Sequence, residues 1–502
     1  MNNSKKSVYN LVFSLISQLV TIALGLIVPR ITMVEYGSET NGLLNSVTQI
    51  VAYLILFEAG IQAVALQSLY KPVRNNDQRE ISEILSAVNI NYKRTGIIYF
   101  VGLVALSSIF PFLSPSEHSY LTVFCVVLFS GLGNVILFFV QGKYKILLQA
   151  EGKTYITTNI QTFITIATNI AKIVLLSLGF NVGVVIFVTF VISLAQALYI
   201  NAYIKKNYKW IDLSMPPKYK ALKEKNAALA HQISGLVFQN TAVLILTIVC
   251  GFKVVSVYAM YKLIVSHISS ILNIPFNSIS FMLGQKFNTE KENYPQIIDT
   301  VEVIYSTGIF AIYSVTACLL VPFMRLYTSG INDINYVDYT VAMLFVTIEL
   351  LTFVRTPLLN TINFAGHFKN TLPQTIMESA INIVVSLICV HALGIYGVLL
   401  GTTTALLYRT IDIIIYTNRK ILLRSPLKTF SIYIPNTLLL FVFVVVYNRL
   451  GIVVNDYIGF IIAGVVLISV AICIFVPVNI LCHKKDLTLI HTVLNNKLKR
   501  SK

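Results

Sequence analysis

Charged residues are scarce in this 502-residue chain. They make up 12% of it, whereas soluble globular proteins carry about 25%. Apolar residues make up 56%, and the mean hydropathy is +0.75. A soluble domain of this length could not bury so much apolar surface behind a polar exterior, so a soluble enzyme is excluded. The composition is typical of a polytopic membrane protein, whose solvent is lipid.

Cysteine is also rare, and its placement excludes its common uses. The six cysteines lie in or at the end of apolar runs, with no CxxC pair and no zinc-binding spacing of Cys and His. A structural disulfide or a metal site is therefore not expected. A glycine-rich phosphate loop is missing too, so we expect no bound nucleotide and no cofactor.

Long apolar runs, in contrast, are abundant. A membrane helix needs about 20 mostly apolar residues. The first run continues past Ile27 with no small-residue cleavage site, which favours a retained helix over a signal peptide. On these criteria the sequence predicts fourteen membrane helices, at 9–29, 42–69, 95–113, 121–141, 155–178, 182–204, 229–250, 254–283, 300–324, 339–364, 373–393, 396–418, 430–447 and 457–482.

The charges of the loops support this count. The even-numbered loops and both termini contain thirty Lys and Arg, whereas the odd-numbered loops contain only Arg30, Lys253, Arg325 and Arg449. Because Lys and Arg accumulate in cytoplasmic loops, both termini are predicted to be cytoplasmic. The net charge of +17 is then explained by loops that face anionic lipid, and no nucleic-acid partner is expected.

The chain also contains an internal duplication. The segment 150–153 (AEGK) opens the fifth predicted helix and 365–369 (AGHFK) opens the eleventh, while 178–184 (LGFNVGV) matches 393–398 (LGIYGV) with one gap. An offset of six helices is even, so the two copies cross the membrane in the same direction. Parallel repeats of this kind build transporters with a substrate path between two lobes and alternating access.

The predicted fold is therefore an all-α polytopic membrane protein with two six-helix lobes and two additional helices. The lobes are 1–204 and 229–418, joined by a basic cytoplasmic linker at 205–228, and the additional helices with a basic tail occupy 419–502.

Polar residues recur at helical spacing inside the predicted helices. Gln161, Asn169 and Lys172 share one face of the fifth, and Lys262 and Asn273 share one face of the eighth, because three- and four-residue steps stay on one side of a helix. A single such stripe is explained by polar contacts between packed helices. Stripes in both copies, two of them with a lysine, favour a water-filled central cavity.

Charges inside the predicted helices need a partner or water, since each costs at least about 2.5–3.5 kcal/mol on insertion. Arg409 and Asp412, three residues apart, are predicted to pair within one helix. The candidate cavity cations are Arg30, Lys172, Lys262 and Arg355. The candidate charge partners or coupling groups are Glu58, Glu349 and Glu378.

Several short motifs support a family resemblance. The first two predicted helices contain 25–30 (GLIVPR), Tyr36-Gly37, Asn41-Gly42 and 57–61 (FEAGI). This series resembles the opening of the oligosaccharide repeat-unit flippases of the multidrug/oligosaccharidyl-lipid/polysaccharide (MOP) exporter superfamily. The step Arg355-Thr356-Pro357, followed by Gly366 and Lys369, is similar to the tenth helix and following loop of that family. The resemblance covers the whole length of the chain.

The resemblance implies a flippase of the bacterial cytoplasmic membrane. Members move an undecaprenyl-diphosphate-linked oligosaccharide repeat unit from the cytoplasmic to the outer leaflet, for surface or capsular polysaccharide. The superfamily implies two lobes around a cationic cavity. Cations in a water-filled cleft can hold the diphosphate, and Asn and Gln can bind sugar hydroxyls. The partners implied are glycosyltransferases and a polysaccharide polymerase. Lipid II flippases are related and have fourteen helices, whereas many repeat-unit flippases have twelve.

Two alternatives remain open on the sequence. A MATE-type multidrug/cation antiporter of the same superfamily would favour carboxylates in its cavity, and Glu58 and Glu349 are such residues. A polysaccharide polymerase or ligase would need a substantial external catalytic loop. The longest predicted external loop, 325–338, holds no histidine and no basic cluster. We therefore expect a transporter and not an enzyme.

Overall fold

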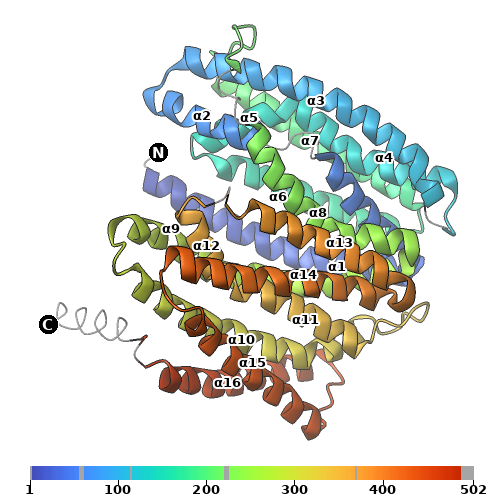
Figure 1. Cartoon of the computed structure of the whole chain (residues 1–502). Helices are drawn as coiled ribbons and strands as arrows, with labels where there is room; N and C mark the ends of the chain where they lie inside the picture. The colour runs from blue at the N-terminus through green and yellow to red at the C-terminus, as the bar shows by residue number, and fades with distance from the viewer. Residues whose placement is uncertain are drawn as a thin grey trace. The chain divides into compact units, whose positions relative to one another are not determined.

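The structure is a computed structural model, and it describes residues 3–55, 61–113, 116–219, 225–367, 370–484 and 486–487. Within these ranges every regular element is a helix (Figure 1). In chain order the elements are α1 (Asn3–Leu54), α2 (Ile61–Asn75), α3 (Gln78–Leu113), α4 (Tyr120–Ile136), η2 (Leu137–Gln141), α5 (Gly142–Ala150), α6 (Thr154–Ser177), α7 (Val182–Asn207), α8 (Lys225–Val249), α9 (Phe252–Thr289), α10 (Tyr294–Tyr327), α11 (Tyr339–Val354), α12 (Thr356–Phe364), α13 (Leu372–Leu393), α14 (Ile395–Tyr416), η4 (Thr417–Ile421), α15 (Leu427–Leu450) and α16 (Tyr457–Cys482).

The chain divides into two compact units. Unit 1 comprises Met1–Ala259 and Ile331–Ile334, and unit 2 comprises Met260–Gly330 and Asn335–Lys502. The division of the chain into transport lobes at 205–228 stays a prediction.

Unit 1 packs around α1, which contacts α4, α6 and α8. Its apolar core includes Leu43, Leu85, Tyr92 and Leu147, each at most 1% exposed. Gly42 allows a very close approach, because a Cβ atom there would stand 1.8 Å from the backbone oxygen of Phe252. This part of α1 is therefore held against the start of α9 with no room for a side chain.

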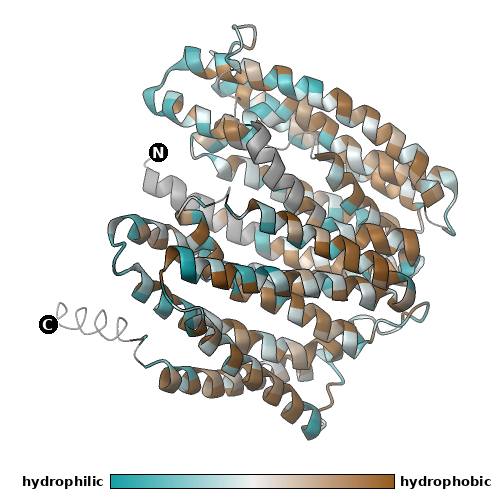
Figure 2. Ribbon diagram, in the orientation of Figure 1, coloured by the Kyte–Doolittle hydropathy of each residue, from teal (hydrophilic) through white to brown (hydrophobic). Residues whose placement is uncertain are grey.

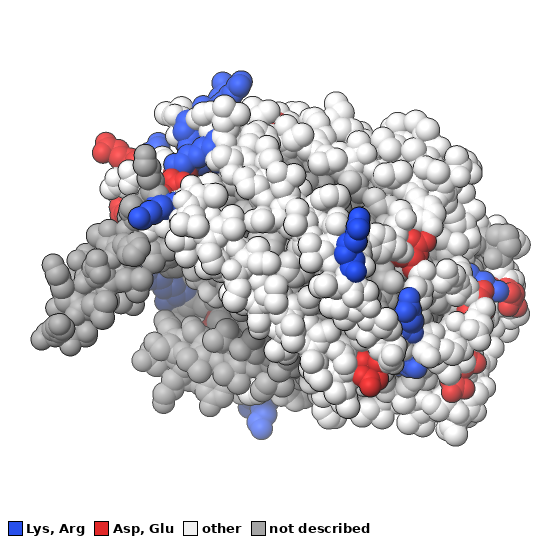
Figure 3. Space-filling model, turned by 90° about the horizontal axis from the view of Figure 1, so that it is seen from below, with Lys and Arg blue, Asp and Glu red and all other residues white. Residues whose placement is uncertain are grey.

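Unit 2 packs around α10, which contacts α11, α15 and α16. In the same unit α13 and α14 pack against each other as a hairpin, and α14 also packs on α11. Apolar residues cover most of α15 and α16 in Figure 2, and most of the face drawn in Figure 3 is neither acidic nor basic. Such surfaces suit a lipid environment.

Twelve stretches of the described residues are long and apolar enough to cross a membrane. The second predicted helix, 42–69, falls on the end of α1 and the start of α2, with 56–60 outside the described residues. The seventh falls on α8, in which Phe238–Val249 forms a shorter apolar stretch. The predicted polytopic all-α class is confirmed, and the count of fourteen stays a prediction.

Gly37 interrupts α1 with a non-helical backbone, at φ 79° and ψ 170°. The next residue, Ser38, donates its backbone N–H and its hydroxyl to the two carboxylate oxygens of Asp333, at 2.7 and 2.6 Å. Positive φ favours glycine, which has no Cβ to clash. The break therefore separates the predicted first helix from the segment that opens the second.

The predicted linker is ordered against unit 1 as far as Tyr219. Trp210, Ile211 and Leu213 pack on the apolar core of unit 1, and the hydroxyl of Ser86 donates to the backbone oxygen of Leu213 at 3.0 Å. Lys218 forms an ion pair with Glu80 at 2.5 Å. Apolar residues placed between the lysines are the sequence signal for this packing.

Candidate functional site

A polar face of α6 carries one of the two predicted cavity cations of unit 1. Lys172 is half-buried there and forms no hydrogen bond or ion pair with any residue that the structure describes. Asn169, on the same helix, donates to the backbone oxygen of Thr165 at 2.7 Å. Gln161 is exposed and accepts a hydrogen bond from Gln196 of α7 at 2.8 Å. Gln161 therefore contributes to helix packing, whereas the ammonium of Lys172 is unpaired among the described residues.

Arg30 lies on α1, next to Pro29, and is half-buried. Helices α1 and α6 pack against each other, and the hydroxyl of Tyr36 donates to the backbone oxygens of Leu176 and Phe180 at 3.1 and 2.7 Å. Arg30 and Lys172 thus stand on two helices of one unit that are in direct contact.

A buried charge cluster joins α13, α14 and the α11–α12 junction of unit 2. Arg355 Nη1 lies 2.7 Å from Glu378 Oε1, and Arg409 Nε lies 3.7 Å from Glu378 Oε2. Arg409 also pairs with Asp412, which confirms the predicted pair within one helix, and donates to Thr375 at 3.3 Å. The side chains of Arg355, Glu378 and Arg409 are at most 12% exposed. Arg355 is therefore already neutralised by a carboxylate.

A second polar group of unit 2 lies between α9, α10 and α11. Glu349 of α11 accepts a hydrogen bond from the hydroxyl of Ser269 at 2.7 Å, and Ser269 also contacts the hydroxyl of Tyr313 at 3.1 Å. Lys262 of α9 is half-buried. Asn273, one turn beyond Ser269, is half-buried and has no hydrogen-bond partner among the described residues.

The remaining predicted charge partner, Glu58, lies outside the described residues. The roles assigned to the ten predicted site residues stay predictions. Among the residues with described positions, no group of three or more His, Cys, Asp and Glu side chains is arranged to hold a metal ion.

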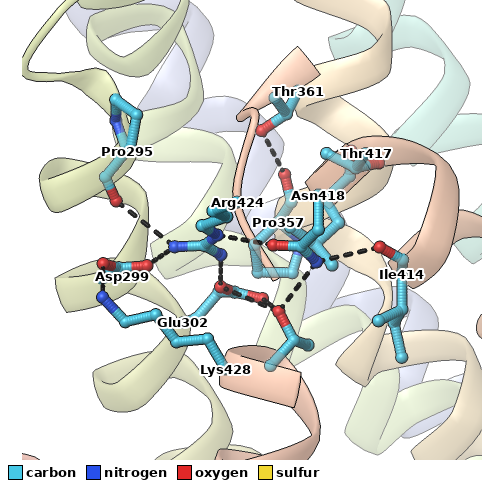
Figure 4. A network of polar contacts seen from close by, with 12 residues as sticks. Pro295, Asp299, Glu302, Pro357, Thr361, Ile414, Thr417, Asn418, Arg424 and Lys428 are labelled. Atoms are coloured by element: carbon cyan, nitrogen blue, oxygen red, sulfur yellow. Dashed lines mark hydrogen bonds and ion pairs between the residues drawn. The ribbon is translucent and has the colours of Figure 1, made fainter. Parts of the chain in front are cut away.

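A polar network that the sequence analysis missed surrounds Arg424, in the loop between η4 and α15 (Figure 4). Arg424 pairs with Asp299 and, at 2.7 Å, with Glu302 of α10, and burial lowers the pKa of its guanidinium to about 10. Lys428 also pairs with Asp299. The sequence contains the signal as two acids, Asp299 and Glu302, and two cations, Arg424 and Lys428. Their contact could not be predicted, because the acids and the cations lie more than 120 residues apart in the chain.

Most of the chain is similar in fold to solved transporters. A lipid II flippase, MurJ, in an inward closed conformation aligns with a TM-score of 0.69 and 15% identity, over 94% of this chain and 99% of that chain. An inward-facing multidrug resistance MATE family transporter of the MOP superfamily aligns with a TM-score of 0.64 and 16% identity, over 80% of this chain and 94% of that one.

A third similar structure is a MATE transporter in the bent conformation, with a TM-score of 0.56 and 16% identity, over 84% of this chain and 96% of that one. No family model and no curated protein matches the sequence. At these identities the likeness shows the fold alone, which this chain shares with these three transporters.

Proposed function

We propose that the protein is a flippase that moves an undecaprenyl-diphosphate-linked oligosaccharide repeat unit across a bacterial cytoplasmic membrane by alternating access. Its substrate would come from glycosyltransferases on the cytoplasmic side and pass to a polysaccharide polymerase outside. The fold of a lipid II flippase supports a lipid-linked substrate. The proposal places both termini of the chain in the cytoplasm.

The observation that carries the proposal is the ammonium of Lys172, which has no partner among the described residues and lies on a polar face of a candidate membrane span. A cation within a predicted span is costly unless it meets water or an anion. A diphosphate headgroup is such an anion, and it cannot cross about 30 Å of hydrocarbon unaided. The amides and hydroxyls of the same face suit the hydroxyls of a sugar.

Arg30 is expected to act at nearly the same depth as Lys172. The Tyr36–Leu176 contact fixes the relative level of α1 and α6, and the predicted topology makes the two helices cross in the same direction. At 1.5 Å per residue, Arg30 and Lys172 then stand about 9 and 6 Å from the level of that contact. Two cations at nearly the same depth can each pair with one phosphate group of a diphosphate.

The test is a flipping assay with purified protein in vesicles that contain an undecaprenyl-diphosphate-linked oligosaccharide. We expect Lys172→Gln to slow flipping about tenfold to a hundredfold, because a hydrogen bond to a charged group contributes about 1.5–3 kcal/mol. Lys205→Gln, at the exposed end of α7, is the matched control and should flip normally. Lys172 is preferred to Arg355, whose removal also breaks the buried ion pair with Glu378. Wild-type rates in both Lys172→Gln and Arg30→Gln would contradict the proposal.

A MATE-type cation antiporter is the second candidate, and Glu349 favours it. This half-buried carboxylate is hydrogen-bonded to Ser269 and interacts electrostatically with Lys262. An antiporter would export a cationic dye from vesicles and lose this activity in Glu349→Gln. Dye export without flipping of the lipid-linked sugar would replace the first proposal with this one.

A further inference from the structure

Two apolar grooves run along opposite sides of α10 in unit 2. One lies between α10 and α16, has a volume of about 420 Å³ and is lined by residues that include Val303, Ala311, Ile472 and Val476. The other lies between α9 and α10 and has a volume of about 460 Å³. Its lining includes Phe276 and Tyr305, whose ring centroids are 5.0 Å apart.

The two grooves share the ridge of α10 that separates them. Ile304 and Gly308 line both grooves, and Ile304 is 52% exposed. At Gly308 a Cβ atom would meet no other atom within 4 Å. The ridge is therefore lowest at Gly308, one turn from Ile304. Two hydrocarbon chains, one in each groove, can join there as parts of one molecule.

The two grooves overlap along α10. The α16 side extends from Val303 to Ala311 and the α9 side from Val301 to Ile312. Nine residues of helix correspond to about 13 Å. Both grooves thus offer an apolar surface at the same depth, which suits two hydrocarbon chains that lie side by side.

An unpaired lysine lies at one end of the groove between α10 and α16. Lys484, which follows α16, lines the groove and is exposed, with no hydrogen bond or ion pair to the described residues. The acids at this end already form ion pairs. Asp299 and Glu302 pair with Arg424 (Figure 4), and Asp486 pairs with Lys428 at 3.1 Å. Lys484 is thus the cation at this end of the groove that no acid among the described residues pairs with.

We propose that α10 is straddled by one diacyl phospholipid with an anionic headgroup. One chain occupies the α10–α16 groove, the other occupies the α9–α10 groove, and Lys484 contacts the headgroup phosphate. The ligand is a resident bilayer lipid and not the transported substrate, so this site does not depend on the proposed function. A single-chain polyprenyl lipid would fill only one of the two grooves.

The site is tested by native mass spectrometry of the full chain in a neutral detergent. The probes are diacyl phosphatidylglycerol, diacyl phosphatidylcholine and the single-chain lysophosphatidylglycerol. We expect about a fivefold preference for phosphatidylglycerol over phosphatidylcholine, because one lysine near the headgroup contributes about 1 kcal/mol. We also expect the diacyl lipid to be retained over the single-chain lipid.

Two variants separate the charge from the grooves. Lys484→Gln should abolish the preference for phosphatidylglycerol, while its control, Lys420→Gln at another exposed lysine, should keep it. Gly308→Leu should raise the ridge between the two grooves and abolish retention of both diacyl lipids. Gly464→Leu, where the Cβ meets only an ordinary contact at 3.7 Å, should retain them. Equal retention of all lipids in the wild type, or undiminished retention in Gly308→Leu, would overturn the proposal, as would preference for the single-chain lipid.

Discussion

Glu378 binds two arginines that come from different helices of unit 2. Arg355 reaches one carboxylate oxygen at 2.7 Å, and Arg409 approaches the other at 3.7 Å. Asp412 gives Arg409 a second acidic partner, whereas Arg355 pairs with no acid other than Glu378 among the described residues. The carboxylate of Glu378 is therefore the group on which the burial of Arg355 depends.

At the residue scale we predict that Glu378→Ala lowers the free energy of unfolding by about 3–5 kcal/mol, because it leaves a buried guanidinium without a partner. Thermal or denaturant unfolding in detergent, followed by circular dichroism, measures the change. Glu290→Ala, which removes an exposed pair with Lys286, should cost at most about 0.5 kcal/mol. If the two variants unfold alike, the cluster does not stabilise the fold.

The α13–α14 hairpin shows how small residues set the distance between helices. A Cβ atom at Gly401 would stand 2.2 Å from the hydroxyl of Ser386 and 2.7 Å from its backbone nitrogen. At Gly397 a Cβ atom would stand 2.5 Å from the backbone of Cys389. Close backbone approach through small residues is the usual way in which membrane helices associate. The two glycines therefore bring α14 close enough to α13 for the bond between Asn382 and Thr402, at 3.1 Å.

At the element scale we predict that Gly401→Ala lowers the free energy of unfolding by about 1–3 kcal/mol, because the added methyl group forces the two backbones apart. Gly308→Ala, where the space is open, should instead be neutral or gain up to about 1 kcal/mol from helix propensity. The same unfolding assay compares the two. A stabilised Gly401→Ala variant would mean that the hairpin can separate without loss.

For the whole molecule, the distribution of Lys and Arg predicts which side of the membrane each loop occupies. The structure leaves Ser214, in the ordered part of the linker, and Asn332, in the loop between α10 and α11, exposed. Both positions are therefore suitable for chemical labelling from water.

We predict that, in a variant without the six native cysteines, Asn332→Cys reacts with a membrane-impermeant maleimide on intact cells. Ser214→Cys should react only after the cells are permeabilised, because its loop lies among cytoplasmic lysines. Gel shift or fluorescence of the labelled protein reports the result. Labelling of Ser214→Cys on intact cells would contradict the predicted orientation and the fourteen-helix count.

Part of the site could be predicted because its signal is local. Arg409 and Asp412 are three residues apart, and a helix brings such residues together whatever surrounds it. Lys172 stands out as a cation within an apolar run for the same reason. The pairing of Glu378 with Arg355 could not be predicted, since two residues on different helices meet only when those helices pack.

The sequence by itself determined the all-helical membrane class, because apolar run length and loop charge depend only on neighbouring residues and on the lipid around them. Tertiary structure alone decided the break of α1 at Gly37, which is closed by Asp333 from a distant loop. It also decided which cations are neutralised: Arg355 and Arg424 meet carboxylates of distant segments, whereas Lys172 and Lys484 meet none in the part of the chain that the structure describes. Whether a charge is free for a ligand depends on what packs against it, and packing brings together residues that the linear sequence leaves far apart.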